Sequence, residues 1–477
     1  MLNTGLTMNK LTRRTTLKGL AALPIAGCAT HHTTQSSAST SAAPWHLADQ
    51  IVAQITTPTF PSRDFPITQF GAVGDDATDC SDAIKGAIEA CHNAGGGRVV
   101  VPNGTFLSGP IHLLSNVNLH LQAGATIAFY TDPKRFLPEV LTRWEGVEFM
   151  GYSPLIYAFE QNNIAVTGKG TLDGRANETT WWPWKGNEEW GKPGFPSQKP
   201  GRDKLFADAE AGVPPEDRHY GDGFYFRPPF VQPYRCQNIL IEDVTIVAAP
   251  FWLLNPVLSE NVTVRGVTLK SLGPNSDGCD PESCKNVLIE DCHFDTGDDC
   301  IAIKSGRNAD GRRINTPTEN VVIRNCEMLA GHGGVVIGSE ISGGVRNVFA
   351  ENNTMSSPDL ERGFRIKTNS VRGGVLEHLY VRNCTIGTVK NAIVINFHYE
   401  EGDAGNFDPT VRHVEVNNLT CEETGQVFQV RGFERAPITD LRFIDCKFKH
   451  ADKPGVIENV DELVIENVSI NGKTFKA

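Results

Sequence analysis

A short alternation of apolar and polar residues recurs along the second half of the chain. The segments NVLIEDCHF (286–294) and NVVIRNCEM (320–328) alternate apolar and polar positions, then carry a polar pair and a second short apolar run. This pattern predicts a short strand, a polar turn and another short strand. Further copies begin at Asn238, Asn261, Asn347, His378, His413, Asp440 and Glu462. The copies start 22 to 35 residues apart, a spacing typical of solenoid repeats.

Each unit is too small to bury its own apolar face, so the copies must stack on one another. The stack predicts an all-β protein, a single right-handed parallel β-helix over residues 61–477. Four copies carry cysteine at their seventh position, at residues 292, 326, 384 and 446. We interpret these as a ladder of small buried side chains, in which cysteine behaves as a hydrophobe. The Asn that opens most copies is interpreted as a turn-stabilising ladder.

Two segments depart from the repeat. Residues 79–93 have a helical pattern that starts with acidic residues and ends before Gly95, which predicts a helix that caps the open end of the solenoid. Cys80 and Cys91 lie on one face of it and are expected to pack on the first coil. Residues at about 175–230 are rich in Trp, Gly, Pro and charge, which predicts a long insertion on one side.

The first residues are typical of an export signal rather than of a folded domain. Residues 1–27 combine a basic start with a short apolar run, and Arg13–Arg14 resembles a twin-arginine signal. LPIAGC resembles a bacterial lipobox, with Cys28 as the lipidated residue. Residues 28–60 are then expected to form a flexible tether. The sequence therefore predicts an exported periplasmic or outer-membrane lipoprotein of a Gram-negative bacterium, which contacts the membrane only through its lipid anchor.

Charge and cysteine count narrow the possible partners. The formal net charge of −12 argues against nucleic acid as a partner, so cationic groups that bind an anionic substrate must be local. Without Cys28, eleven cysteines remain, an odd number that a complete disulfide framework cannot use. We expect no cofactor and no metal ion, and no pattern indicates an oligomer, so a monomer is expected.

Polar clusters follow the strand pairs at the same phase of successive repeats. They are NSD with Asn275 and Asp277, GDD with Asp298 and Asp299, GHG with His332, and RIK with Arg365 and Lys367. Coils of such a solenoid stack about 4.8 Å apart, so groups at matching phase would line one groove. Each cluster alone has a structural explanation, whereas all four in order on consecutive coils form a specific combination, in which Arg365 and Lys367 could clamp a carboxylate and His332 could share a proton with the acids.

These four motifs resemble those of glycoside hydrolase family 28, the polygalacturonases. The family pattern is Asn-Thr-Asp, Gly-Asp-Asp, Gly-His-Gly and Arg-Ile-Lys, and the one departure here is Ser276 in place of Thr. The resemblance covers roughly residues 65–470 and implies a pectin-lyase-like solenoid that hydrolyses α-1,4 bonds between galacturonic acids with inversion. The substrate would be a pectic polysaccharide or an oligogalacturonide. RPPFVQPYRCQNILIEDVTI and WWPWK further resemble the bacterial exo-acting branch.

The resemblance also implies roles for the acids. Asp298 would be the general acid, Asp277 and Asp299 would activate water, and His332 would support the acid. An inverting pair of carboxyl groups is expected to lie about 6.5–9.5 Å apart. Clustered carboxylates raise one another's pKa, which would help to keep the acid protonated.

The remaining assignments concern the substrate. Arg365 and Lys367 would bind the sugar carboxylate, Tyr399 would contact substrate, and Asn275 would orient its loop or contact substrate. Lys304 is interpreted as structural rather than catalytic.

An exo-acting enzyme needs one closed end of its groove. The insertion supplies four tryptophans, of which Trp182 is expected to stack on a sugar, and five basic residues: Lys185, Lys192, Lys199, Arg202 and Lys204. The alternative is that the tryptophans pack the insertion's own small core.

Other functions stay open on the sequence. A rhamnogalacturonan or xylogalacturonan hydrolase would share the fold, as would a calcium-dependent pectate lyase, in which acids bind calcium. The order of Asp, Asp-Asp, His and Arg-Lys argues against the lyase. A non-catalytic glycan-binding β-helix would not require these groups at one phase.

Overall fold

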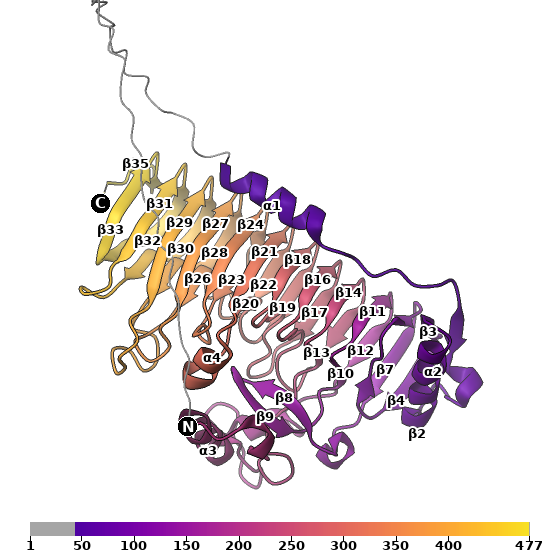
Figure 1. Cartoon of the computed structure of the whole chain (residues 1–477). Coiled ribbons are helices and arrows are strands. Elements are labelled where there is room, and N and C mark those ends of the chain that lie inside the picture. Colours follow the sequence, from indigo (N-terminus) through magenta and orange to yellow (C-terminus); the bar gives the residue numbers. More distant parts are fainter. Residues whose placement is uncertain (1–42, 477) are drawn as a thin grey trace, which may run out of the picture. The chain divides into compact units, whose positions relative to one another are not determined.

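The computed structural model describes residues 43–476, which form a right-handed parallel β-helix with its axis along the length of the molecule (Figure 1). The predicted fold is therefore confirmed. The first sheet holds thirteen parallel strands, one from each coil. In spatial order they are β1 (Asp64–Pro66), β3 (Gly97–Val101), β6 (Val117–Leu121), β11 (Asn162–Gly168), β14 (Gln237–Glu242), β16 (Glu260–Arg265), β18 (Lys285–Glu290), β21 (Thr318–Arg324), β24 (Val345–Glu351), β27 (Val375–Arg382), β29 (Thr410–Asn417), β31 (Ile438–Ile444) and β33 (Val460–Glu466).

The second sheet follows the first after a tight polar turn in each coil, as the repeat predicts. Its strands pair in parallel except for the last, β35, which pairs antiparallel with β34. They are β2 (Asp75–Asp79), β4 (Gly104–Ser108), β7 (Ala125–Phe129), β12 (Thr171–Asp173), β15 (Thr245–Val247), β17 (Thr268–Ser271), β19 (His293–Thr296), β22 (Glu327–Ala330), β25 (Thr354–Met355), β28 (Thr385–Asn396), β30 (Thr420–Arg431), β32 (Lys447–Glu458), β34 (Ser469–Ile470) and β35 (Lys473–Thr474).

A third sheet closes the coils. Its first three strands are β5 (Ile111–His112), β10 (Ile156–Phe159) and β13 (Val231–Tyr234), and its later strands are β20 (Ile301–Ile303), β23 (Val335–Ile337) and β26 (Arg362–Lys367). Single parallel bridges through Leu254 and Cys279 link the two groups. Beyond β26, the long strand β28 merges the second and third sheets. The corner between these two sheets is the part of the fold that carries the chemistry described below.

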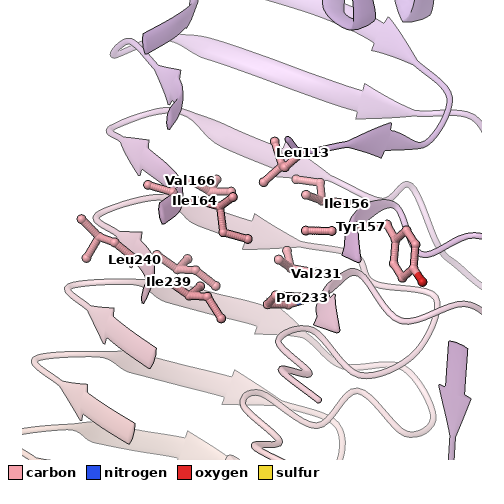
Figure 2. A pocket seen from close by; sticks show the side chains of 12 residues that line it. Leu113, Ile156, Tyr157, Ile164, Val166, Val231, Pro233, Ile239 and Leu240 are labelled. Atoms are coloured by element: carbon pink, nitrogen blue, oxygen red, sulfur yellow. The ribbon is translucent and has the colours of Figure 1, made fainter. Parts of the chain in front are cut away.

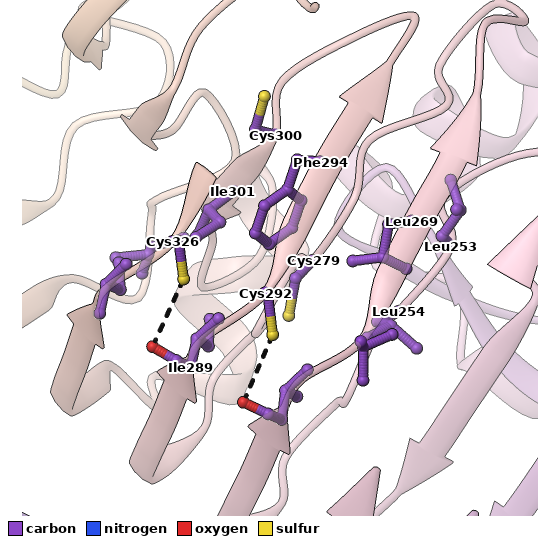
Figure 3. Packing of buried hydrophobic residues seen from close by; sticks show 14 of the residues in the cluster. Leu253, Leu254, Leu269, Cys279, Ile289, Cys292, Phe294, Cys300, Ile301 and Cys326 are labelled. Atoms are coloured by element: carbon purple, nitrogen blue, oxygen red, sulfur yellow. Dashed lines mark hydrogen bonds between the residues drawn. The ribbon is translucent and has the colours of Figure 1, made fainter. Parts of the chain in front are cut away.

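The interior of the solenoid consists of in-register apolar stacks. Figure 3 shows Cys292 and Cys326 pointing into this core beside Phe294 and Cys279. The two thiols lie 3.6 Å from the carbonyl oxygen of Val264 and 3.8 Å from that of Ile289, each on the preceding coil. All eleven cysteines within residues 43–476 are free and buried. The interpretation of Cys292, Cys326, Cys384 and Cys446 as a ladder of small buried side chains is confirmed.

The asparagines that open the repeats form a second ladder. Asn261, Asn286 and Asn320 all have φ near +57°, in the left-handed region that Asn tolerates better than most residues. The side-chain amide of Asn286 donates to Asn261 (3.3 Å) and accepts from Asn320 (3.0 Å). The chain of amide bonds extends from Asn116 to Asn347. The predicted turn-stabilising ladder is confirmed.

The N-terminal end is capped by helix α2 (Ser81–Asn93), close to the predicted helix at 79–93. Its buried face, with Ile84, Ile88 and Cys91, joins the main core (Figure 1). Cys80, just before the helix, is also fully buried. A short 3-10 helix, η1 (Ile67–Phe70), precedes it.

The predicted tether is wrong over part of its length. Residues 43–54 form helix α1 (Ala43–Gln54), which lies across the outer face of the first sheet (Figure 1). Trp45, Ala48 and Ile51 recur every third residue and pack on Leu288, Val322 and Phe349, which point outward from that sheet. Covering this exposed apolar stripe stabilises the helix. The predicted signal, the twin arginines and Cys28 lie outside the described residues. Among the helices of residues 43–476, none has the length and apolar character needed to cross a bilayer.

The insertion and an unpredicted hairpin stand together beside the solenoid. The insertion contains η3 (Trp182–Lys185), α3 (Lys199–Glu210) and η4 (Pro215–Asp217), and the hairpin pairs β8 (Val140–Trp144) with β9 (Val147–Gly151). Trp144, Leu205 and Phe226 share one small core with Phe251 of the solenoid. Helix α4 (Asn308–Ile314) joins them through the buried Arg218–Asp310 ion pair (3.0 Å). A further short helix, η2 (Pro133–Phe136), precedes the hairpin.

One apolar void lies inside the solenoid among Leu113, Ile156, Val231 and Ile239 (Figure 2). Its volume is about 10 Å³, room for at most one water molecule. It is a packing void, and the substrate must bind elsewhere.

The asparagine ladder gives a stability prediction. Asn286→Ala removes two amide hydrogen bonds and places Ala at positive φ, so we expect a loss of about 2–4 kcal/mol of unfolding free energy. Asn286→Gly removes the same bonds without the backbone strain, and should cost about 1–2 kcal/mol. Chemical denaturation of the three proteins checks this, and an alanine variant as stable as the wild type would show that the ladder contributes nothing.

Candidate active site

The four polar clusters meet at the corner between the second and third sheets. Asp277 follows β17, Asp298 and Asp299 lie between β19 and β20, and His332 lies between β22 and β23. Backbone bonds tie these turns together, with the Gly278 amide donating to the Asp299 carbonyl at 2.9 Å. The structure therefore brings the predicted residues to one place on consecutive coils. Asp277, Asp298 and His332 line a cavity of about 500 Å³, whereas Asp299 is fully buried and does not line it.

Three carboxylates lie close together at this cavity. Oxygens of Asp277, Asp298 and Asp299 all lie within 4.8 Å of one another. This is closer than the 6.5–9.5 Å expected from the sequence for an inverting pair. Asp299 is fully buried and accepts from Lys367 (2.6 Å), with Arg365 at 3.5 Å. The close spacing is tolerated because each acid has a cation beside it.

His332 is the cation that lies beside Asp298. Its Nδ1 lies 2.9 Å from Asp298 Oδ1, and its backbone amide donates to the Asp298 carbonyl. The preceding Gly331 has φ +142°, and a Cβ there would lie 2.3 Å from that same carbonyl oxygen. Only glycine allows this close approach, as the sequence pattern suggests.

A second cation group, centred on Lys304, lies beneath Asp277. Lys304 Nζ is 3.7 Å from both Asp277 and Asp280 and 3.2 Å from Glu340, and it stands 4.5 Å from the ring centre of Trp252. The lysine is almost fully buried and lines the cavity beside Asp277. Glu340 could not be predicted as a site residue, because it lies in none of the four motifs.

Protonation differs from the expectation for Asp298. Burial raises the pKa of Asp298, but the His332 imidazolium and the Lys367 and Lys185 ammonium groups outweigh burial and hold it below its usual value. The Asp298 carboxylate in turn raises the pKa of His332 to about 9. The pair thus shares one proton that rests on His332. The expectation of a protonated Asp298 considers only the repulsion between neighbouring carboxylates. It leaves out the direct hydrogen bond from His332, which lowers the pKa of Asp298.

The pKa of Asp277 is shifted in the opposite direction to that of Asp298. Burial, reinforced by the charges of Asp280 and Asp298, raises the pKa of Asp277 well above its usual value, although Lys304 opposes the shift. Asp277 Oδ1 and both oxygens of Asp280 are buried without a hydrogen-bond partner within residues 43–476. Lys304 can balance only one negative charge of the buried pair Asp277 and Asp280, so the other carboxyl group can hold a proton.

Of the residues expected to contact substrate, Arg365, Lys367, Tyr399 and Asn275 line the cavity. Tyr399 lies 5.4 Å from both Arg365 and Lys367, and Asn275 lines the cavity. Trp182, in contrast, does not line it. Its ring packs against Gly273 and Trp190, and its Nε1 donates to the Ala249 carbonyl at 3.0 Å. Trp190 lies in the cavity wall where Trp182 was expected, and the sugar-stacking role of Trp182 stays a prediction.

Glu145 of the hairpin and Lys185, Trp190 and Arg202 of the insertion form one wall of the cavity, here called the closing wall. Glu145, at the hairpin tip, pairs with Arg202 of α3 (3.0 Å) and lies 3.6 Å from Arg307, which also pairs with Glu340 (3.3 Å). Gly146 has φ +82° and packs on the backbone of Arg307. A continuous row of buried charges thus joins the closing wall to the Lys304 group.

The three acids have the spacing of a metal site, but their partners do not suit one. Asp299 is held by Lys367 and Asp298 by His332. A divalent ion would have to displace both cations, so this donor set fits charged protein partners better than a metal.

The fold and the site together define a class of protein, a β-helix enzyme with a carboxylate centre for an anionic chain. Residues 223–471 match the model of glycosyl hydrolases family 28, and residues 65–124 match one for rhamnogalacturonase A/epimerase, pectate lyase-like proteins. The chain belongs to glycosyl hydrolases family 28, and it is a glycoside hydrolase.

Relatives of this chain include exo- and endo-acting enzymes. A hyperthermoactive exopolygalacturonase from Thermotoga maritima is 45% identical, with a TM-score of 0.84 over 89% of this chain and 96% of that chain. An exo-poly-α-D-galacturonosidase of Dickeya chrysanthemi is 27% identical over 87% of this chain and 72% of its own length. An endo-polygalacturonase of Pectobacterium carotovorum subsp. carotovorum is 28% identical over 73% and 80%.

The shared proton can be measured directly. His332 should titrate near pH 9 in an NMR titration, because the Asp298 carboxylate stabilises its charged form. In Asp298→Asn the pKa of His332 should fall towards the ordinary value of about 6.5. Asp295→Asn, a neighbouring acid that pairs with Lys270, serves as the control and should leave the pKa of His332 unchanged. A wild-type value near 6.5 would contradict the ion pair.

Proposed function

We propose that this enzyme hydrolyses the α-1,4 bonds of polygalacturonate from a chain end, with inversion at the anomeric carbon. The observation that carries the proposal is a carboxylate centre at a cation-lined cavity, one wall of which is built from the insertion and the hairpin. In this proposal the wall closes one end of the cavity, so a chain terminus enters and a through-running chain is excluded. Exo-acting relatives support cleavage from a chain end, in particular the Thermotoga maritima enzyme, which is 45% identical.

Asp298 is the proposed general acid. The proton that it shares with His332 passes to the leaving glycosidic oxygen, and the pair holds that proton up to about pH 9. His332 acts through Asp298 and is a positioning residue in this scheme.

Asp277 and Asp299 are proposed to hold and activate the attacking water. Their oxygens lie within 4.8 Å, and two hydrogen bonds of about 2.8 Å allow one water to bridge such a pair. Lys367 donates to the other side of the Asp299 carboxyl group and holds it in place. The acid supplies a proton on one side while the water attacks on the other, as inversion requires.

The substrate carboxylate is proposed to bind at Arg365 and Lys367, beside Tyr399. These two cations share the single buried carboxylate of Asp299, so they carry net positive charge towards an incoming anion. They supply the local attraction that a chain of net charge −12 needs for an acidic polymer.

We also propose export with a lipid anchor at Cys28. The twin arginines, the lipobox-like LPIAGC and eleven cysteines that are all reduced and buried support a protein that folds before export.

A time course with defined oligogalacturonides tests the reaction. We expect mono- or digalacturonate from the first minutes, and a loss of about 10²- to 10⁴-fold in kcat for Asp298→Asn, with KM little changed. Asp295→Asn should keep full activity. A spread of product lengths would contradict exo action, and no release from any galacturonate chain would overturn the substrate in favour of a substituted pectin.

Chelation distinguishes hydrolysis from metal-dependent elimination. Activity should survive EDTA, since protein cations already occupy the carboxylates, and products should show no new ultraviolet absorbance from a double bond. Loss of activity on EDTA treatment that calcium restores would favour a lyase.

A further inference from the structure

Lys185 occupies an unusual position in the closing wall of the cavity. It ends the short helix η3 of the insertion, and its ammonium group donates to Asn275 Oδ1 at 2.6 Å. Asn275 is two residues before Asp277, so this contact places Lys185 beside the catalytic acids.

Lys185 differs from every other cation that lines the cavity. Within residues 43–476 each of the others has a carboxylate within 4.0 Å, whereas Lys185 has none. The paired cations are Arg202 with Glu145, Lys304 and Arg307 with Glu340, His332 with Asp298, Arg362 with Glu361, and Arg365 and Lys367 with Asp299.

A second unpaired cation stands behind it. Arg227 is fully buried and donates to the same Asn275 oxygen at 2.8 Å, and its other contacts are Gln198 and the carbonyls of Pro250 and Pro274. Burial lowers the pKa of both Lys185 and Arg227, although nearby Glu145 and Asp298 oppose the effect. Two cations without a close counter-ion are costly to bury, and an anion in the cavity would relieve that cost.

The two donors also fix the orientation of Asn275. Its oxygen accepts from both cations, which turns the amide NH₂ away from them, and that NH₂ has no partner within residues 43–476. The Lys185 ammonium keeps further N–H donors beyond the one that it gives to Asn275, and an ammonium without a carboxylate partner suits an anion such as a carboxylate.

Coil order separates this site from Arg365 and Lys367. Asn275 precedes the Asp298 coil, whereas Arg365 lies two coils after it, roughly 10 Å along the axis at about 4.8 Å per coil. Lys185 thus contacts the coil before Asp298, whereas Arg365 and Lys367 reach back to Asp299 from two coils after it. A chain that lies along the axis with its cut bond at Asp298 would have one sugar towards Lys185 and the other towards Arg365.

We propose that Lys185 binds the carboxylate of the terminal sugar and makes the closed end selective for a uronic acid over a neutral sugar. This inference rests on the proposed exo-hydrolysis. Arg202 cannot serve this purpose equally, because Glu145 already neutralises it. Arg227 holds Asn275 in place independently, so loss of Lys185 leaves the loop supported.

The test compares two trigalacturonates that differ in one group. One is unmodified, and the other has the carboxyl of the sugar at the released end reduced to a hydroxymethyl group. The wild type should prefer the unmodified substrate by about 10- to 100-fold in kcat/KM, the range of one charge-assisted contact. In Lys185→Gln, kcat/KM should fall on the unmodified substrate and stay the same on the reduced one, so most of the preference is lost. Lys185→Arg keeps the positive charge and should retain part of the preference.

Lys192→Met is the matched control. Lys192 lies in the same insertion, pairs with Glu178 and does not line the cavity, so the preference should be unchanged. Equal loss on both substrates in Lys185→Gln would show a merely structural lysine, and an unchanged preference would show that another group reads the carboxylate. Either result overturns the inference while the exo-hydrolysis stands, whereas a wild type inactive on both substrates overturns both.

Discussion

Charge neutralisation between adjacent coils is the constraint on which this site depends. Stacking at about 4.8 Å forces Asp277, Asp298 and Asp299 into one small volume, where like charges repel and lose hydration. The structure meets that cost by placing a cation against each acid: Lys304 beside Asp277, His332 beside Asp298 and Lys367 beside Asp299. The same pairs set where protons rest. Stability of the corner and readiness for acid–base chemistry therefore come from one set of contacts.

The closing wall depends on the same principle. Glu145 would be a lone buried acid without Arg202 and Arg307, and Arg307 connects it to Glu340 and so to Lys304. The hairpin and insertion are thus locked to the solenoid by charge as well as by the aromatic core around Trp144. A regular scaffold supplies the acids, and an irregular addition supplies the closing wall.

The solenoid and the four motifs could be predicted from sequence because both follow a period. Alternation gave the strands, and a common phase placed Asp298 and His332 on neighbouring coils. The positions of residues outside the repeats could not be predicted. Glu145 and Glu340 reach the site through a hairpin and a loop that no repeat marks. Trp182 and Trp190 look alike in sequence, and only packing against Gly273 shows which one turns away. Helix α1 was missed because its apolar stripe is short and its partner is the outer face of a sheet.

The central claim is that water, held by Asp277 and Asp299, attacks the anomeric carbon directly. Proton NMR during the first minutes of trigalacturonate hydrolysis tests it most directly, because it reads the new reducing end before mutarotation. The account predicts that the sugar released from the chain end appears first as the β anomer. First appearance of the α anomer would mean retention through a covalent intermediate, which the close spacing of the carboxylates would then explain, and would contradict the proposed mechanism.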